Sequence, residues 1–351
     1  MDMCVSELIS QLIIDLGQRH VFSLPGYFII DLSMAMKSSG LDLIAFRHEA
    51  AAVMAADGYS RSRGTVATTL INTGPSFMNA IGPLMAAKKD QIPIVTFVGV
   101  DEASRYLDEG LFQTAPIPES LFKATVHLRK YSDIVGAIRH AYRLAASPPG
   151  GPVLVVVPID VAQRLATPDA IPLSVLEEAP PTQVDYSPDI DHIESKLSES
   201  RRPLFVFGGG SLGHRSRDLA NALTRTLKIP SLMTIHALGL LEDDNPYNMG
   251  WIGTLDRSRG GSDIYGADCI VAFGARLSDR FIESKFRHSD ITQVNISPDH
   301  FAYNRRVSRI VGDCIPIMEK LLERSGTTPP VEGWRPDPHQ GSPEPADTEN
   351  L

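Results

Sequence analysis

The residue with the clearest potential for chemistry is a single carboxylate, Glu49, which lies between an apolar run at residues 41–46 and an alanine-rich run at residues 50–56. This pattern predicts a short buried strand followed by a helix, with Glu49 in the first helical turn. The helix dipole favours the ionised carboxylate, whereas exclusion of water favours the protonated form. A carboxyl group balanced between these effects is a candidate for proton transfer, and a simple helix N-terminal charge is the alternative. The adjacent His48 could orient a substrate or form a local hydrogen bond.

Other strands predicted in the first half of the chain also end in residues suited to a ligand site. Pro25-Gly26 follows an apolar run at residues 20–24, and Thr73-Gly74-Pro75, with Asn79, follows residues 65–71. Ligands of open α/β sheets gather at the carboxyl ends of the strands. We therefore expect these residues to lie near Glu49, although ordinary turns would also place glycine and proline there.

Two glycine-containing turns follow strands predicted in the second half. Gly208-Gly209-Gly210 follows residues 203–207, and Gly274-Ala275-Arg276 follows residues 269–273. Glycine lets backbone amides approach an anion, so the first turn could cradle a phosphate. It lacks the spacing of the dinucleotide fingerprint, and a tight turn is the alternative.

Strand, turn and helix alternate along the chain, and strands that are apolar on both faces are typical of a parallel sheet covered by helices. The predicted fold class is therefore α/β, with two doubly wound parallel-sheet domains. Predicted strands span 20–24, 41–46, 65–71, 92–98, 153–157, 203–207, 229–234, 269–273, 291–296 and 310–311; predicted helices span 5–16, 28–36, 49–63, 78–87, 132–146, 193–197, a stretch from about 216, and 315–322.

Composition divides the chain into four parts. Residues 1–164 and 188–326 carry the α/β pattern, and residues 165–187 are rich in Pro, Thr, Glu and Ala, as expected of a linker. Residues 327–351 combine six prolines and several acids with few aliphatic residues, which predicts a disordered tail. Residues 101–118 interrupt the pattern and are expected to form a loop.

The charge and cysteine content exclude several classes of function. The 351 residues carry a net charge of −9 with no long basic run, which argues against nucleic acid and against an anionic membrane surface as partners. The three cysteines have no metal-ligand spacing, and no metal-binding residues are predicted. No signal-type segment or transmembrane-length apolar run is found, so a cytoplasmic location is expected.

Taken in order, these motifs resemble thiamine-diphosphate-dependent enzymes of the acetolactate synthase and pyruvate decarboxylase type, with the greatest likeness to the acetolactate synthase large subunit. The resemblance covers nearly all of the chain before the tail. It rests on Ser23-Leu24-Pro25-Gly26, Arg47-His48-Glu49-Ala50-Ala51, Asp57-Gly58-Tyr59-Ser60-Arg61, Thr73-Gly74-Pro75 with Asn79, Gln91-Ile92-Pro93-Ile94, Ile229-Pro230, Gly239-Leu240, Asn245-Pro246, Gly274-Ala275-Arg276 and Val311-Gly312-Asp313.

The resemblance implies a role for Glu49. It would hydrogen-bond the pyrimidine ring of thiamine diphosphate and favour the imino form, which removes the proton from the thiazolium carbon. The reaction implied by the resemblance is decarboxylation of a 2-oxo acid, with pyruvate as the expected substrate, and transfer of the acyl unit to an acceptor. The predicted catalytic residues are Glu49, His48 and Gln113. The predicted cofactor-binding residues are Pro25, Gly26, Thr73, Gly74, Pro75, Asn79, Gly208, Gly209, Gly210, Gly274 and Arg276.

Several features depart from the family pattern. Relatives hold the diphosphate and Mg²⁺ with a Gly-Asp-Gly motif in a third domain, and Gly312-Asp313-Cys314 does not match it. We therefore expect a split enzyme in which a separate chain carries the diphosphate-binding domain and the Mg²⁺ ligands, in a hetero-oligomer built on a homodimer. Ser76-Phe77 replaces a usual Gly-Ala, and Phe77 could reshape the pocket. Ser278 and Ser297 stand where acids are common, which leaves FAD binding open.

Two other functions remain open from the sequence. One is a non-catalytic binding or regulatory homologue that keeps the fold. The other is a central domain that binds a nucleotide such as FAD or CoA as its main function.

Overall fold

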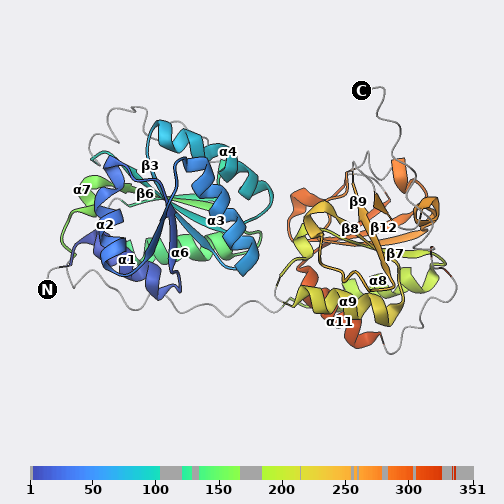
Figure 1. Cartoon of the computed structure of the whole chain (residues 1–351). Helices are drawn as coiled ribbons and strands as arrows, with labels where there is room; N and C mark the ends of the chain where they lie inside the picture. Colours follow the sequence, from blue (N-terminus) through green and yellow to red (C-terminus); the bar gives the residue numbers. More distant parts are fainter. Residues whose placement is uncertain are drawn as a thin grey trace, which may run out of the picture. The chain divides into compact units, whose positions relative to one another are not determined.

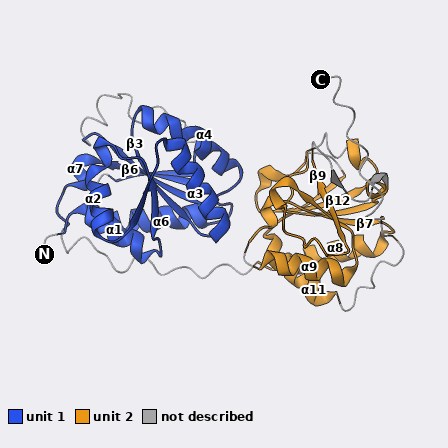
Figure 2. Cartoon of the chain, viewed as in Figure 1, with its two compact units in different colours: residues 1–180 blue, residues 181–351 orange. Residues whose placement is uncertain are grey.

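The computed structural model describes residues 3–102, 121–128, 134–166, 184–213, 215–253, 257–258, 261–278, 284–302 and 306–325, together with residues 334 and 336. Two compact units divide the chain, Met1–Pro180 and Pro181–Leu351 (Figure 2). In each unit strands and helices alternate along the chain (Figure 1), which confirms the predicted α/β class. Most of the predicted linker and tail lies outside the described residues.

Unit 1 is built on a six-stranded sheet in the order β2-β1-β3-β4-β6-β5, in which every pair of neighbours is parallel. The strands are β1 His20–Ser23, β2 Asp42–Ala45, β3 Ala67–Asn72, β4 Ile94–Val100, β5 Ala124–His127 and β6 Pro152–Pro158. The helices are α1 Val5–Asp15, η1 Tyr27–Ile29, α2 Ile30–Ser38, α3 Glu49–Arg63, α4 Pro75–Lys89, α6 Ile134–Ala146 and α7 Ile159–Ala162.

Helices cover both faces of the unit 1 sheet. One core cluster joins α1, α2 and α6 to residues such as Val21 of β1, and the other joins α3 and α4 to Phe22 of the same strand. Neighbouring residues of a strand point to opposite faces, so Val21 and Phe22 serve different cores. The continuous apolar strands β4 and β6 are buried at every residue, as the sequence predicts for a sheet covered on both sides.

The two edge strands of unit 1 differ from the prediction. Strand β2 was expected to be buried, but it lies at the sheet edge and its residues are exposed or half-buried. Strand β5 was not predicted; it lies at the other edge and is half-buried throughout. An edge strand has a neighbour on one side only, so it needs fewer apolar residues and gives a weaker sequence signal.

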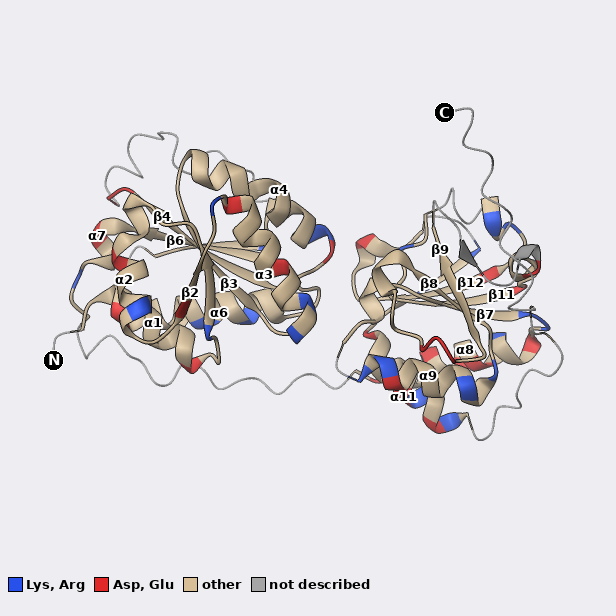
Figure 3. Ribbon diagram, viewed as in Figure 1, with Lys and Arg blue, Asp and Glu red and all other residues tan. Residues whose placement is uncertain are grey.

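Figure 3 shows that charged residues of both units lie mainly on helices and loops.

Unit 2 contains a seven-stranded sheet in the order β10-β9-β8-β7-β11-β12-β13, in which the pairs are parallel apart from β10 with β9. The strands are β7 Pro203–Phe207, β8 Ser231–Thr234, β9 Asn248–Ile252, β10 Arg257–Ser258, β11 Cys269–Phe273, β12 Asp290–Asn295 and β13 Val307–Val311. The helices are α8 Ser187–Glu199, η5 Gly209–Ser211, α9 Ser216–Leu227, η6 Ile235–Ala237, η7 Gly261–Gly266, η8 Pro298–His300 and α11 Cys314–Arg324. Strands β9 and β10 were not predicted.

The core of unit 2 also has two sides. Phe205 and Phe207 of β7 join the cluster beneath α8, α9 and α11, whereas Leu204 and Val206 join the cluster on the opposite face. Trp334, within the predicted tail, is partly buried against the second cluster.

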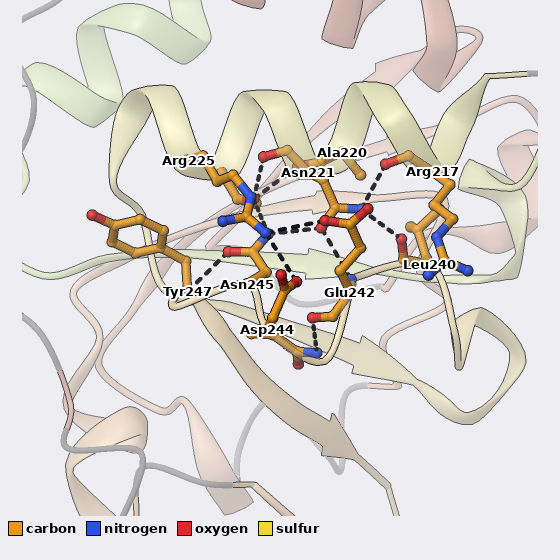
Figure 4. A network of polar contacts seen from close by, with 11 residues as sticks. Arg217, Ala220, Asn221, Arg225, Leu240, Glu242, Asp244, Asn245 and Tyr247 are labelled. Carbon is orange, nitrogen blue, oxygen red and sulfur yellow. Dashed lines mark hydrogen bonds and ion pairs between the residues drawn. The ribbon is translucent and has the colours of Figure 1, made fainter.

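A buried polar network ties α9 to the segment that leads into β9 (Figure 4). The Asn221 side-chain amide donates to the carbonyls of Arg217 at 2.7 Å and Leu240 at 3.0 Å. Its oxygen accepts from the Glu242 backbone amide at 3.0 Å and from the Asn245 side chain at 2.8 Å. All four hydrogen-bonding positions of this side chain are therefore filled inside the protein.

In unit 1, a close contact between Gly99 of β4 and η1 positions the turn after β1. A Cβ atom at Gly99 of β4 would overlap the Phe28 carbonyl oxygen and the Ile29 side chain. The missing side chain at Gly99 thus lets η1 cross the carboxyl end of the sheet.

We expect Gly99→Ala to destabilise unit 1 by about 1–3 kcal/mol, because the added methyl forces η1 away from β4. Gly58→Ala in α3 is the matched control, since its Cβ would meet nothing within 4 Å. Replacing a glycine inside a helix by alanine should be neutral or stabilising by up to about 1 kcal/mol. Thermal unfolding followed by circular dichroism compares the two, and equal melting temperatures for both variants would contradict the assignment.

We expect Asn221→Ala to lower the free energy of unfolding of unit 2 by about 2–4 kcal/mol, because it leaves several buried polar groups without a partner. Thr226→Ala is the control: Thr226 is exposed on the same helix, and such changes usually stay within about 0.5 kcal/mol. Urea titration measures both variants. A cost for Asn221→Ala no larger than that for Thr226→Ala would show that the network adds little stability.

Candidate functional site

Glu49 lies where the sequence predicts it, at the first residue of α3 after the edge strand β2. The preceding residue, His48, is the helix N-cap, and its Nδ1 accepts a hydrogen bond from the Ala50 amide at 3.1 Å. The imidazole therefore forms the local hydrogen bond that the sequence left as an alternative, and it fixes the start of the helix. Glu49 itself is buried, with 4% of its surface exposed.

Two residues of α4 hold the Glu49 carboxylate. The Asn79 side-chain amide donates to its Oε2 at 3.0 Å, and the Ser76 hydroxyl donates a further hydrogen bond. Burial raises the pKa of Glu49, but the hydrogen bonds from Ser76 and Asn79, together with a backbone hydrogen bond and the electrostatic effect of His48, outweigh it and hold the pKa below the usual 4.5. The carboxylate is therefore buried and ionised at neutral pH.

The sequence did not identify Ser76 as a partner of Glu49. The only sequence signal at this position is that Ser76-Phe77 stands where family members usually have the smaller pair Gly-Ala. The two side chains point to different surroundings: Ser76 reaches Glu49, whereas Phe77 is 1% exposed and packs in the core with its ring 6.0 Å from that of Phe122. Phe77 therefore fills the core between α4 and the sheet.

The turn between β3 and α4 sets the direction of α4. Gly74 has φ 67° and ψ −134°, a backbone conformation that glycine adopts without strain, and Pro75 opens the helix with its ring-restricted φ. Thr73, before them, is buried. This geometry places Ser76 and Asn79, on the first two turns of α4, beside the first turn of α3.

Pro25 and Gly26 lie in the turn between β1 and η1, and Asn72 holds this turn against the end of β3. The Asn72 Oδ1 accepts a hydrogen bond from the Phe28 amide at 3.0 Å. A Cβ at Gly26 would lie 2.7 Å from the Asn72 Cγ, so only glycine fits there without a shift. Asn72 was not among the predicted site residues, although its place at the end of a strand before Thr73-Gly74-Pro75 was a usable signal.

The predicted gathering of residues at one sheet edge is present in unit 1. Strands β2, β1 and β3 are neighbours and parallel, so the residues that follow them share the carboxyl edge. The roles of these residues toward a cofactor stay predictions. Gln113, the third predicted catalytic residue, lies outside the described residues.

In unit 2, the glycines of the two predicted turns pack against each other, backbone against backbone. A Cβ at Gly208 would overlap the backbone of Gly274 and Ala275, and one at Gly210 would lie 3.0 Å from the Gly274 Cα. The Gly208 amide donates to the Phe273 carbonyl at 2.8 Å, and the Gly210 amide donates to the Gly274 carbonyl at 3.0 Å. These two amides are thus already engaged within the protein, and the glycines let the ends of β7 and β11 pack together. Gly209 lies against His236, and Arg276 is exposed.

Within the described ranges, no group of three or more His, Cys, Asp or Glu side chains is arranged to hold a metal ion. Cys269 and Cys314 are buried thiols, and Cys4 is half-buried. None of the described helices is long and apolar enough to cross a membrane.

Comparison with known proteins assigns both units to one family. Residues 3–118 match the N-terminal TPP binding domain of thiamine pyrophosphate enzymes, and residues 190–321 match the central domain of thiamine pyrophosphate enzymes. Together the two matches cover most of the chain, and each falls within one unit.

Similar curated proteins include acetolactate synthases. The chain is 28% identical to the acetolactate synthase large subunit of Buchnera aphidicola over 333 residues, which are 91% of the chain and 57% of the relative. It is 28% identical to the Escherichia coli acetolactate synthase isozyme 3 large subunit over 330 residues, again 91% of the chain and 57% of the relative. It is 27% identical to the Mycobacterium bovis acetolactate synthase over 316 residues, 88% of the chain and 51% of the relative. The chain thus spans about half the length of these relatives.

The matched residues of unit 1 include Glu49 and the strand-end turns around it, and those of unit 2 include both glycine turns. The chain therefore belongs to the thiamine pyrophosphate enzyme family, of which it carries the N-terminal TPP binding domain and the central domain.

Proposed function

We propose that this chain supplies the pyrimidine side of a thiamine diphosphate site in an acetolactate-synthase-like enzyme, which decarboxylates a 2-oxo acid, pyruvate, and transfers the acyl unit to an acceptor. The observation that supports the proposal most directly is Glu49, a buried carboxylate that two neighbouring side chains keep ionised. Such a group can accept a hydrogen bond from a protonated ring nitrogen, and it thereby stabilises the protonated form of a pyrimidine ring.

Thiamine diphosphate, when bound, supplies the electron sink for cleavage of the bond between the carboxylate and the carbonyl carbon. The chain's own residues would orient it. Glu49 would hold a proton at the pyrimidine ring, and Asn79 and Ser76 would fix the carboxylate in one orientation. His48 would act through Glu49, because its cap bond sets the first turn of α3.

The turns at the carboxyl edge would form the walls of the pyrimidine pocket. Pro25 and Gly26 are held in place by Asn72, and Thr73-Gly74-Pro75 sets the start of α4. Both turns rest on central strands of the sheet, so the pocket would be preorganised rather than formed on binding.

The diphosphate group and Mg²⁺ need further ligands. Mg²⁺ takes oxygen ligands in octahedral geometry, and the described residues offer no cluster of carboxylates for it. We propose that a diphosphate-binding domain outside these residues supplies them, either as a separate chain in a hetero-oligomer built on a homodimer or as a continuation of this chain.

FAD is not part of the proposed function. The Gly208 and Gly210 amides, which were expected to cradle a phosphate, already donate to carbonyls of the adjacent turn. The absorbance spectrum of the purified protein tests this directly, since a bound flavin absorbs visible light.

We expect Glu49→Gln to lower the turnover of the assembled enzyme by about a thousandfold or more, because an amide cannot hold the proton as a carboxylate does. The assay mixes the chain with a diphosphate-binding domain of the same family, thiamine diphosphate and Mg²⁺, and follows carbon dioxide release from pyruvate and other 2-oxo acids. Assembly should be unchanged when measured by size-exclusion chromatography.

Glu199→Gln, on the exposed part of α8, is the matched control and should retain full turnover. Unchanged turnover of Glu49→Gln would contradict the role of this residue. Absence of turnover from the wild-type complex, with assembly intact, would favour the non-catalytic homologue.

The lowered pKa of Glu49 predicts how the stability of unit 1 depends on pH. Because the pKa in the folded protein lies below 4.5, the ionised side chain stabilises the fold above about pH 4.5, and this contribution is lost as the pH falls through the folded pKa. We expect the difference in unfolding free energy between wild type and Glu49→Gln to shrink between pH 6 and pH 3.5. Urea titrations at each pH measure it.

Asn79→Ala and Ser76→Ala should each raise the Glu49 pKa, because each removes a hydrogen bond that offsets the effect of burial. The loss of stability on acidification should accordingly begin at higher pH in these variants. A difference between wild type and Glu49→Gln that stays constant over this range would show that the pKa is not depressed.

A further inference from the structure

An open cavity of about 1290 Å³ lies in unit 1. It lies at the end of the sheet where the strands begin, whereas Glu49 lies at the end where they finish. Its lining comes from the residues between α1 and β1, from the end of α3 and the turn after it, from Pro93 just before β4, and from the second half of α6. These segments precede the strands or end the helices, so they belong to the amino edge of the parallel sheet. The proposed function uses none of them.

The cavity is strongly basic. Arg19, Arg63, Arg139 and Arg143 line it, and Asp15 is the single acidic residue among the lining side chains. Asp15 already accepts a hydrogen bond from the Gln11 side chain at 2.9 Å. Such a concentration of cations is unexpected in a chain whose net charge is −9.

None of these four guanidinium groups forms an ion pair with a carboxylate in the described part of the chain; the side-chain contact of Arg143 is with the His140 ring nitrogen at 3.2 Å. Other arginines are paired, and the pairs are Arg61 with Asp57 and Asp90, Arg164 with Asp160, Arg225 with Glu242 and Asp244, and Arg324 with Asp191 and Glu194. The four arginines of the cavity thus differ from these paired arginines, because none of the four has a carboxylate partner among the described residues.

The helix dipole explains part of this arrangement. Arg63 and Arg143 lie in the last turns of α3 and α6, where a cation is favoured by the carbonyl end of the helix. Arg139 lies a turn earlier on the same face as Arg143, where two like charges repel each other. Arg19 lies beyond the end of α1. A bound anion would offset this repulsion.

We propose that this cavity binds an anion that carries two or more phosphate groups. The guanidinium group donates two parallel hydrogen bonds to phosphate oxygens, and several arginines can share a chain of phosphates. The volume is sufficient for an inorganic polyphosphate or for a nucleotide. Tyr59 and His20 also line the cavity, with their rings 5.5 Å apart, and they offer an aromatic surface to a base.

Isothermal titration calorimetry of the whole chain with tripolyphosphate, and separately with ATP, tests the proposal at low and at moderate salt. We expect saturable binding of one equivalent. Arg63→Gln and Arg139→Gln should each weaken it by about tenfold, as the loss of a charge-assisted hydrogen bond predicts. Arg217→Gln is the matched control, because Arg217 is an exposed arginine of unit 2 without an ion pair in the described residues.

Glu49→Gln should bind both anions as the wild type does, which separates this cavity from the thiamine diphosphate site. Tighter binding of ATP than of tripolyphosphate would show that the base contributes, and equal binding would show that the phosphates alone are recognised; both support the proposal. Three results would overturn the proposal: no binding at millimolar concentration, wild-type affinity in both Arg63→Gln and Arg139→Gln, or a loss of affinity in Arg217→Gln as large as in those two variants.

A second measurement covers the case in which these variants do not fold. Phenylglyoxal modifies exposed arginines, and mass spectrometry locates the adducts in the wild-type chain. Tripolyphosphate should protect Arg19, Arg63, Arg139 and Arg143 and leave Arg217 reactive. Equal modification of all five arginines with and without the anion would overturn the proposal.

Discussion

The constraint on which the rest of the structure depends is the burial of both faces of each parallel sheet. Parallel strands require crossover connections, and helices in these connections cover both faces. Val21 and Phe22, adjacent in β1, therefore belong to separate cores, as do Phe205 and Val206 in β7. Because apolar side chains fill both faces of the sheet, polar and charged groups lie at the two ends of its strands, the amino edge and the carboxyl edge. In unit 1 the carboxyl edge holds Glu49, and the amino edge holds the basic cavity.

Glu49 shows how a buried carboxylate can stay ionised. Removal from water favours the neutral acid, yet donors on an adjacent helix reverse the balance. Those donors are effective because α4 starts at a fixed place, set by the positive φ of Gly74 and by Pro75. At the same carboxyl end of the sheet, Asn72 accepts a hydrogen bond from the Phe28 amide and so holds the turn after β1. The electrostatic state of one side chain thus depends on backbone geometry at two strand ends, those of β2 and β3.

The glycine turns of unit 2 show why a motif has to be considered with its hydrogen bonds. Glycine next to a strand end suits a phosphate cradle and also suits a close contact between two backbones. In this chain the Gly208 and Gly210 amides donate to the neighbouring turn, and the ends of β7 and β11 meet there. The amide partners therefore assign these unit 2 glycines to the packing of two strand ends.

The sequence by itself determined the α/β class, most of the central strands, the start of α3 at Glu49 and the family motifs, because apolar runs and turn residues are local signals. The edge strands β5 and β10 gave little signal, since one side of an edge strand has no neighbour and its residues need not be apolar. Strand β9 lies between β10 and β8, and Asn248 and Gly250 interrupt its apolar pattern. The partnership of Ser76 and Asn79 with Glu49 was decided only by tertiary structure, because it depends on how α3 and α4 pack. The grouping of four arginines in one cavity was also invisible in sequence, since they are distributed from residue 19 to residue 143 and meet only when the helices return to the amino edge of the sheet.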